Sequence, residues 1–102
     1  MQTLETLLPI LRDAKVALMA KYPITEMGVF GSYVRGEAQE TSDLDILLDY
    51  DLQHKRLSAF DILDMETYLS QKTGIDTHIA SKAAVMQRKY TAPYIFSEVR
   101  VI

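Results

Sequence analysis

The chain contains no cysteine, which excludes disulfide bonds and thiolate metal sites. It also lacks any apolar run near the roughly 20 residues that a helix needs to cross a bilayer. The start of the chain has neither the basic segment nor the small-residue cleavage site of a signal peptide, so we expect a cytoplasmic location. Basic residues are not in excess either, since 11 Lys and Arg against 14 Asp and Glu give a net charge of -3. That balance argues against a domain that wraps nucleic acid, and we expect neither a membrane nor a direct nucleic-acid partner.

The chain has 102 residues, of which 48% are hydrophobic and 25% are charged. This composition is typical of a folded domain rather than of a disordered tail. The length fits one small domain with a modest core. We therefore expect a single domain over residues 1–102.

Helical and strand patterns alternate along the chain. A helical rhythm runs from Leu4 to Tyr22, and we expect this helix to begin near Thr6 or to bend at Pro9. The remaining expected helices span 32–37 with Ser32 as its cap, 57–72 with Gly74 as its stop, and 82 to about 90 with Ser81 as its cap. Expected strands span 24–30, 44–50 and 75–80, and residues 94–102 could form a helical turn and then a short strand, which the pattern does not decide. The order α-β-α-β-α-β-α predicts a small α/β sandwich whose sheet is covered mainly on one face.

Acidic residues gather in a short stretch that contains no lysine or arginine. Asp43, Asp45, Asp49 and Asp51 alternate with apolar residues there. Asp43 and Asp45 lie two residues apart at the start of an expected strand, so their side chains share one face. Two carboxylates this close repel unless a cation lies between them, and oxygen ligands favour Mg²⁺ or Mn²⁺. The alternative is a polar strand entry in which Asp43 caps a turn.

A third carboxylate is needed to complete a two-metal site. Asp76 is the candidate, because it stands alone at the start of an apolar strand directly after Gly74 and Ile75. Asp49 is the second choice, although it lies further along its strand. His78 shares the face of Asp76, but a lone histidine is more often structural than functional.

Gly31 and Ser32 lie between an expected strand and an expected helix, which is the arrangement of a phosphate-binding turn. The alternative is an ordinary strand-to-helix turn. Arg35 either steadies a phosphate or pairs with Glu37 or a strand carboxylate. Tyr33 is either a wall for a nucleotide or a core aromatic. Three basic residues of the last expected helix either form a solvated face or include one that binds a phosphate: Lys82, Arg88 and Lys89.

These residues combine into a recognisable pattern. Gly31-Ser32, ten further residues and Asp43-Leu44-Asp45, followed by Asp76 on a later strand, resemble the minimal nucleotidyltransferases of the DNA polymerase β superfamily. The resemblance extends over nearly the whole chain. It implies the small nucleotidyltransferase fold, with an about three-stranded mixed sheet packed with helices.

The resemblance also implies roles for particular residues. Asp43, Asp45 and Asp76 would be the catalytic carboxylates and would bind two Mg²⁺ ions, or Mn²⁺ in their place. Gly31 and Ser32, with Arg35, would hold the phosphates of a nucleoside triphosphate, ATP by analogy. A hydroxyl would attack the α-phosphorus and pyrophosphate would leave.

The small size narrows the choice within this superfamily, because the chain has little room for a domain that binds the acceptor. Stand-alone chains of this kind look like the antitoxin of HEPN–nucleotidyltransferase pairs, which transfers AMP from ATP to a tyrosine of a HEPN ribonuclease toxin. We therefore expect such a toxin as partner. One alternative is a binding module that neutralises the toxin by occlusion, through an apolar patch that the following residues could form or else bury in the core: Phe60, Leu63, Tyr90, Tyr94 and Phe96. Another is a small-molecule nucleotidyltransferase that works with a separate acceptor-binding subunit.

Overall fold

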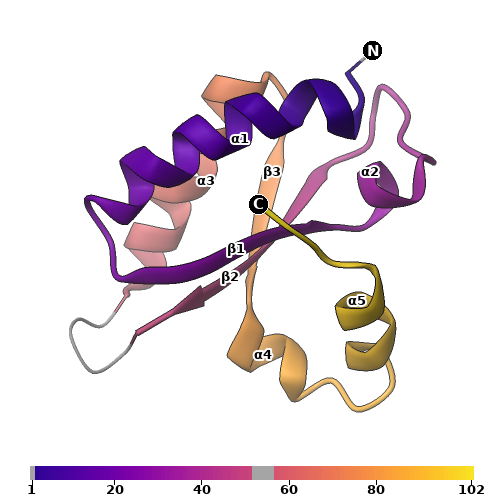
Figure 1. Ribbon diagram of the computed structural model, residues 1–102. Coiled ribbons are helices and arrows are strands. Elements are labelled where there is room, and N and C mark those ends of the chain that lie inside the picture. Colours follow the sequence, from indigo (N-terminus) through magenta and orange to yellow (C-terminus); the bar gives the residue numbers. More distant parts are fainter. Residues whose placement is uncertain (1, 52–56) are drawn as a thin grey trace.

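The computed structural model describes residues 2–51 and 57–102, which form a mixed sheet with helices packed against both faces (Figure 1). The elements along the chain are α1 (Leu4–Met19), β1 (Ile24–Phe30), α2 (Ser32–Arg35), β2 (Leu44–Tyr50), α3 (Ala59–Thr73), β3 (Thr77–Ser81), α4 (Lys82–Met86), α5 (Ala92–Glu98) and β4 (Arg100–Val101). In the sheet the order is β3-β2-β1-β4. β1 runs antiparallel to β2 and to β4, and β3 runs parallel to β2.

The first two strands match the sequence prediction at both ends, and the two long helices differ from it at their starts. α1 begins at Leu4 rather than near Thr6, because Thr3 and Thr6 form a reciprocal capping box ahead of Pro9. The helix continues past Pro9, which lies inside it. α3 begins at Ala59 rather than at Leu57, since Ser58 and Asp61 form a second capping box. Gly74 ends α3 in the left-handed conformation, as predicted.

The C-terminal part is more divided than the sequence predicted. Ser81 caps α4 through a hydrogen bond from the N–H of Ala84, as expected, but the helix ends at Met86 instead of near Tyr90. A separate helix, α5, follows, and β4 then pairs with β1. The sheet therefore has four strands, and residues 94–102 contain both structures that the sequence left open: the end of a helix and a short strand.

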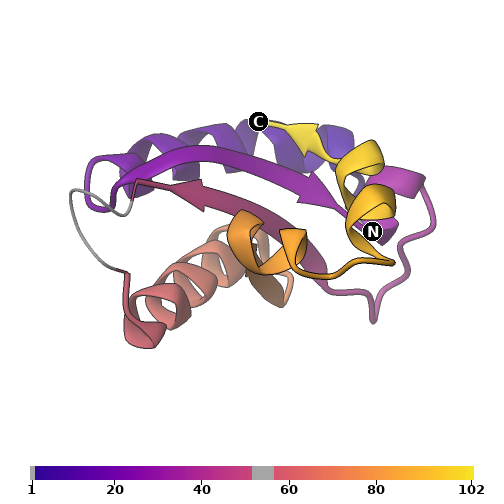
Figure 2. The same ribbon diagram turned by 90° about the horizontal axis from the view of Figure 1, so that it is seen from below.

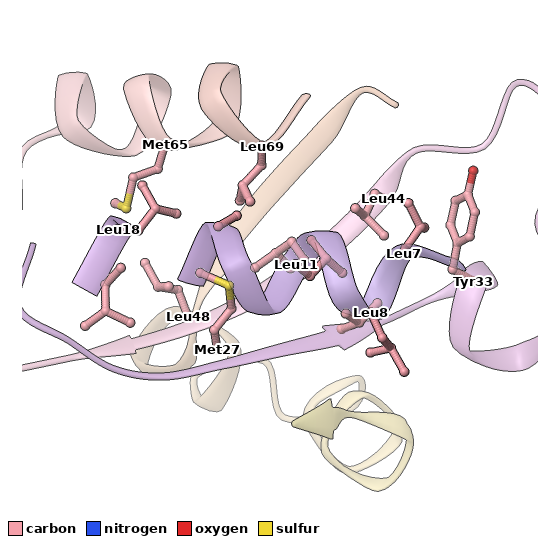
Figure 3. Close-up of a cluster of buried hydrophobic side chains, with 14 of the residues drawn as sticks. Leu7, Leu8, Leu11, Leu18, Met27, Tyr33, Leu44, Leu48, Met65 and Leu69 are labelled. Atoms are coloured by element: carbon pink, nitrogen blue, oxygen red, sulfur yellow. The ribbon is translucent and has the colours of Figure 1, made fainter. Parts of the chain in front are cut away.

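The core lies mainly on one face of the sheet, which we call the core face. Figure 1 shows α1 and α3 above the strands and α4 and α5 below them. Figure 3 shows the leucines of α1 pointing toward Met27, Leu48, Met65 and Leu69, which come from β1, β2 and α3. Met65 and Leu69, predicted as the stripe of the second long helix, are fully buried, whereas Phe60 and Leu63 are exposed. Tyr33 is also buried against this core, so it is a core aromatic and not a nucleotide wall.

The opposite face, which we call the site face, carries a much smaller apolar cluster. Leu47, Val85 and Ala92 are its buried members, and half-buried residues such as Phe30 and Phe96 pack around them. Seen from below in Figure 2, α4 lies across the middle of the strands while α1 runs behind them. Among the described residues, none of the helices has the length and apolarity needed to span a membrane.

Candidate active site

The turn from β1 into α2 is built around Gly31. This residue has a φ of +84°, a backbone region that side chains other than glycine's rarely adopt. A Cβ at this position would lie 2.3 Å from Oδ2 of Asp45. Both constraints require glycine here, and the second shows that the turn and the second carboxylate of the Asp-x-Asp pair touch. The N-cap of α2 is Gly31 itself, so the predicted capping role of Ser32 is wrong.

The two aspartates lie at the start of β2, where Phe30 of β1 pairs with Asp45. Leu44 between them points into the core, which leaves Asp43 and Asp45 on the site face. Asp43 is exposed and Asp45 is half-buried. Burial raises the pKa of the Asp45 carboxyl, and the charge of Asp43 adds to that rise, while His78 and Arg35 oppose it. The ionised pair is therefore under-compensated, which is the condition that a bound cation relieves.

His78 joins this pair through the register of the sheet. β3 lies beside β2, and Asp45 is level with His78 across the two parallel strands. The histidine therefore has its side chain on the site face, with Nε2 3.1 Å from Oδ2 of Asp43. On its other side, Nδ1 lies 4.0 Å from Oε2 of Glu66 in α3. The sequence favoured a structural role for His78 without excluding a functional one, and the structure places its side chain against Asp43 of the predicted metal pair.

Asp76, the predicted third carboxylate, lies just before β3. Its carbonyl oxygen accepts the N–H of Leu44 at 2.8 Å, and its side chain lies on an exposed edge. Asp76 and Asp43 line a shared hollow formed by residues 40–43 and 74–76. Besides burial, the charges that affect the pKa of the Asp45 carboxyl are those of His78, Asp43, Arg35 and Glu98. The second choice, Asp49, accepts the N–H of Tyr50 at 3.0 Å, further along β2.

Glu98, at the end of α5, is a site residue that the sequence reasoning missed. Its Oε1 accepts the backbone N–H of Gly31 at 2.9 Å, and its two oxygens accept from Arg35 at 3.1 and 3.0 Å. Arg35 also donates to Glu37 at 3.2 Å. These hydrogen bonds raise the pKa of Arg35, with Glu98 contributing most.

The carboxylate of Glu98 thus accepts a hydrogen bond from the N–H of Gly31, in the turn that was predicted to bind phosphate. Because Glu98 is separated from the turn by most of the chain, no local sequence signal could have identified it. The pairing of Arg35 with Glu37 was one of the two roles left open for that residue, and Glu98 is an additional partner.

Comparison with known proteins identifies the family. Residues 11–100 match the family model described as the nucleotidyltransferase domain. A protein adenylyltransferase, MntA, from Thermococcus cleftensis is 39% identical over 85 residues, which cover 83% of this chain and 83% of the relative. The chain belongs to the nucleotidyltransferase domain family and is a nucleotidyltransferase.

Solved structures agree with this assignment. A structure described as a minimal nucleotidyltransferase superposes with a TM-score of 0.74 at 29% identity, covering 97% of this chain and 95% of that one. The fold is also found in a complex of a tri-AMPylated Shewanella oneidensis HEPN toxin with its MNT antitoxin. That match has a TM-score of 0.56 at 13% identity and covers 95% of this chain and 66% of that one. At this identity it shows the fold alone.

The donor set fits a divalent cation that arrives with a nucleotide. Within residues 2–51 and 57–102, no three Asp, Glu or His side chains form a ready-made metal cage. Mg²⁺ commonly takes only one or two carboxylates from the protein and its other oxygens from phosphates and water. Asp43 and Asp45, on one face and beside the Gly31 turn, supply that pair.

Proposed function

We propose that the chain is a protein adenylyltransferase that transfers AMP from ATP to a tyrosine hydroxyl of a HEPN-domain toxin and so neutralises it. The observation that carries this proposal is the contact between Gly31 and Asp45, which brings the phosphate turn and the carboxylate pair to one point. The similarity to an archaeal protein adenylyltransferase, MntA, supports adenylyl transfer to a protein. The fold shared with an MNT antitoxin chain supports a HEPN partner.

The chain's own residues perform the positioning. Asp43 and Asp45 hold the divalent cations, and the turn at Gly31 and Ser32 holds the β- and γ-phosphates. Bound Mg²⁺ supplies neutralisation of phosphate charge and polarisation of the α-phosphate. Glu98 already accepts hydrogen bonds from the N–H of Gly31 and from Nη1 of Arg35, so a phosphate must displace it to use these donors.

The reaction exchanges one bond to phosphorus for another. The tyrosine oxygen forms a bond to the α-phosphorus, and the bond from the α-phosphorus to the oxygen that bridges to the β-phosphate breaks. Pyrophosphate leaves with that electron pair, and the hydroxyl proton passes to water. The role of Asp76 as the third metal ligand that helps to activate the hydroxyl stays a prediction.

Mass spectrometry of the partner tests the proposal. We expect one or more adenylates on the toxin after incubation with the chain, ATP and Mg²⁺, and none in the presence of EDTA. Asp43→Asn and Asp45→Asn should abolish the transfer. Asp49→Asn is the matched control, because it changes the same residue type on the same face of β2 away from the turn, and it should retain transfer. An unmodified toxin in the wild-type reaction would contradict the proposal.

Occlusion is a second candidate, favoured by large apolar side chains that stay exposed. Phe60 is 79% exposed and Tyr90 is 88% exposed, and Leu63 and Tyr94 are also exposed. Phe96, in contrast, packs against the site-face cluster. If Asp45→Asn still neutralises the toxin without modifying it, occlusion is sufficient. Transfer to a small hydroxylated molecule in the absence of any toxin would instead support a small-molecule acceptor.

A further inference from the structure

A hollow between α3 and β3 continues the site on the side away from the phosphate turn. We propose that this hollow binds the segment of the toxin that carries the acceptor tyrosine, and that a Lys or Arg and an apolar side chain flank that tyrosine. This inference rests on the proposed function, because it names the surface that presents the hydroxyl to the bound nucleotide. We call the surface the acceptor hollow, and its walls include Leu63, Glu66 and Ser70 of α3 with Asp76, Thr77 and His78.

The order of the strands gives the direction from which the tyrosine approaches. At the level of Asp45, Phe30 of β1 lies on one side and His78 of β3 lies on the other. The turn at Gly31 follows Phe30, so the phosphates that leave lie on the β1 side. In phosphoryl transfer the attacking and leaving oxygens are roughly in line, on opposite sides of the phosphorus. The tyrosine hydroxyl must therefore approach from the β3 side, where the acceptor hollow lies.

The acceptor hollow adjoins the carboxylates of the site. Asp76 lines it and also lines the smaller hollow that contains Asp43. His78, another wall residue, has its Nε2 3.1 Å from Oδ2 of Asp43. The volume of about 460 Å³ falls in the range of small-ligand sites, roughly 300–1,000 Å³. The hollow therefore has room for a tyrosine side chain whose hydroxyl lies at the carboxylates.

The walls of the hollow suit an inserted side chain rather than an added strand. β3 is at the edge of the sheet, where N–H groups commonly pair with the strand of a partner. Here Oγ of Ser70 accepts the N–H of Thr77 at 3.0 Å, and Oε2 of Glu66 accepts the N–H of Ile79 at 2.8 Å. Because α3 takes up these two donors of β3, a partner backbone cannot use them. The partner must instead place a side chain between α3 and β3.

Charge and exposed apolar area define the chemistry of the segment that fits. Among the described residues that line the hollow, Glu66 and Asp76 are carboxylates and none is Lys or Arg. With Asp76 at the metal, Glu66 is the charge that a Lys or Arg beside the tyrosine pairs with. Leu63 is 57% exposed, and Phe60, one turn earlier in α3, is 79% exposed. An apolar neighbour of the tyrosine covers these side chains, since exposed apolar patches mark interaction surfaces.

Photo-cross-linking tests where the segment docks. Leu63 is replaced by p-benzoylphenylalanine, and the chain is mixed with the toxin, Mg²⁺ and α,β-methylene-ATP, which cannot donate its adenylate. After irradiation, we expect the cross-linked toxin peptide to include or adjoin the tyrosine that the wild-type chain adenylates. The same group in place of Val16, which is 71% exposed on α1, is the matched control and should not reach that peptide.

A matched pair of carboxylates in α3 tests the charge. Glu66→Gln keeps an oxygen for the N–H of Ile79 but removes the negative charge. It should raise the KM for the toxin about threefold, the size of one surface ion pair, and the difference should shrink at high salt. Asp64→Asn is the control, because Asp64 lines a groove between α3 and α1 instead of the acceptor hollow. It should leave that KM unchanged.

Leu63→Arg tests the apolar and the charged contact together. It should raise the KM for the toxin about tenfold, the effect of one well-placed interface side chain. The affinity for ATP, measured by calorimetry, should stay at the wild-type value, because the nucleotide lies on the other side of the carboxylates. Circular dichroism of each variant confirms that the fold is retained.

The outcomes separate this inference from the proposed function. A wild-type KM for both Leu63→Arg and Glu66→Gln overturns the inference and leaves the proposed function standing. So do cross-links from the Leu63 position that miss the acceptor peptide, and so does an equal loss of ATP affinity in Leu63→Arg. A toxin that the wild-type chain does not modify overturns both.

Discussion

The two faces of the sheet differ in what they bury. The core face, under α1 and α3, buries most of the large apolar side chains, and several of them are completely inaccessible. The apolar cluster of the site face, under α4 and α5, has three buried members among the described residues, Leu47, Val85 and Ala92. This face also carries the carboxylates and His78. Because successive strand residues point to opposite faces, a single strand serves both purposes. In β2, Leu44 and Leu48 stabilise the domain while Asp45 between them carries charge.

This division explains how a domain of 102 residues tolerates a cluster of carboxylates. Half-buried like charges cost stability, and the core face supplies the apolar burial that offsets them. Substitutions on the core face should therefore lower the stability of the domain, whereas substitutions of the charged residues on the site face should change its chemistry.

The largest expected effect comes from a matched pair of adjacent leucines in β2. Leu48 is fully buried on the core face, and Leu47 is 4% exposed in the smaller cluster of the site face. Leu48→Ala should lower the free energy of unfolding by about 3–5 kcal/mol, the usual cost of a rigid cavity. Leu47→Ala should cost about 2 kcal/mol, because its thinner cover can relax. Urea unfolding measures both, and equal losses would mean that the two faces are packed alike.

Gly31→Ala should lower both the stability of the domain and its adenylyl transfer activity. The substitution meets a positive φ and a collision with Asp45, so we expect a loss of about 1–3 kcal/mol together with most of the adenylyl transfer. Gly74→Ala is the control, since it shares the positive φ but has nothing within 4 Å of the new Cβ. It should lose stability and retain the activity of the folded fraction. A Gly31→Ala variant with normal transfer would show that the contact with Asp45 is dispensable.

The sequence predicted the features that depend on neighbouring residues. The strand 44–50, the Gly74 stop and the Asp-x-Asp pair all depend on short-range periodicity or conformational preference, and the structure has β2 and the Gly74 cap as expected. The division of the C-terminal segment into α5 and β4 was left open, because it depends on pairing between β4 and β1.

The site shows the same limit of sequence reasoning. Alternation placed His78 and Asp76 on one face, but only the register between β2 and β3 brings His78 level with Asp45. Glu98 reaches Gly31 because α5 folds back over the end of β1, which no local pattern encodes. Contacts between distant segments are therefore what the structure adds to the site.

Glu98→Gln tests whether this carboxylate competes with phosphate at the turn around Gly31. Glutamine can still accept the N–H of Gly31, but it removes the negative charge that holds Arg35. We expect ATP to bind up to about fivefold more tightly, the size of one exposed charge interaction, with the gain shrinking at high salt. Titration calorimetry at two salt concentrations measures the change. Weaker binding would mean that Glu98 supports the turn rather than competing with phosphate.

Asp45→Asn should have the smallest effect on the free energy of unfolding. Unlike the leucine and glycine substitutions, it should raise this free energy. The folded protein raises the pKa of Asp45, chiefly by burial, so folding favours the protonated carboxyl. Above that raised pKa the ionised side chain costs stability, and a neutral asparagine removes the cost. In EDTA at pH 7 the variant should therefore melt at a higher temperature than the wild type.

The gain should shrink as the pH falls and vanish below the ordinary aspartate pKa of 3.8, where the carboxyl is protonated in both folded and unfolded chains. Asp49→Asn, which changes the same residue type further along the same face of β2, is the control in the same melting series. A site carboxylate whose removal stabilises the domain while abolishing transfer would be retained for chemistry alone. A lower melting temperature for Asp45→Asn would instead place Asp45 among the residues that hold the fold together, and the separation between the two faces would not hold.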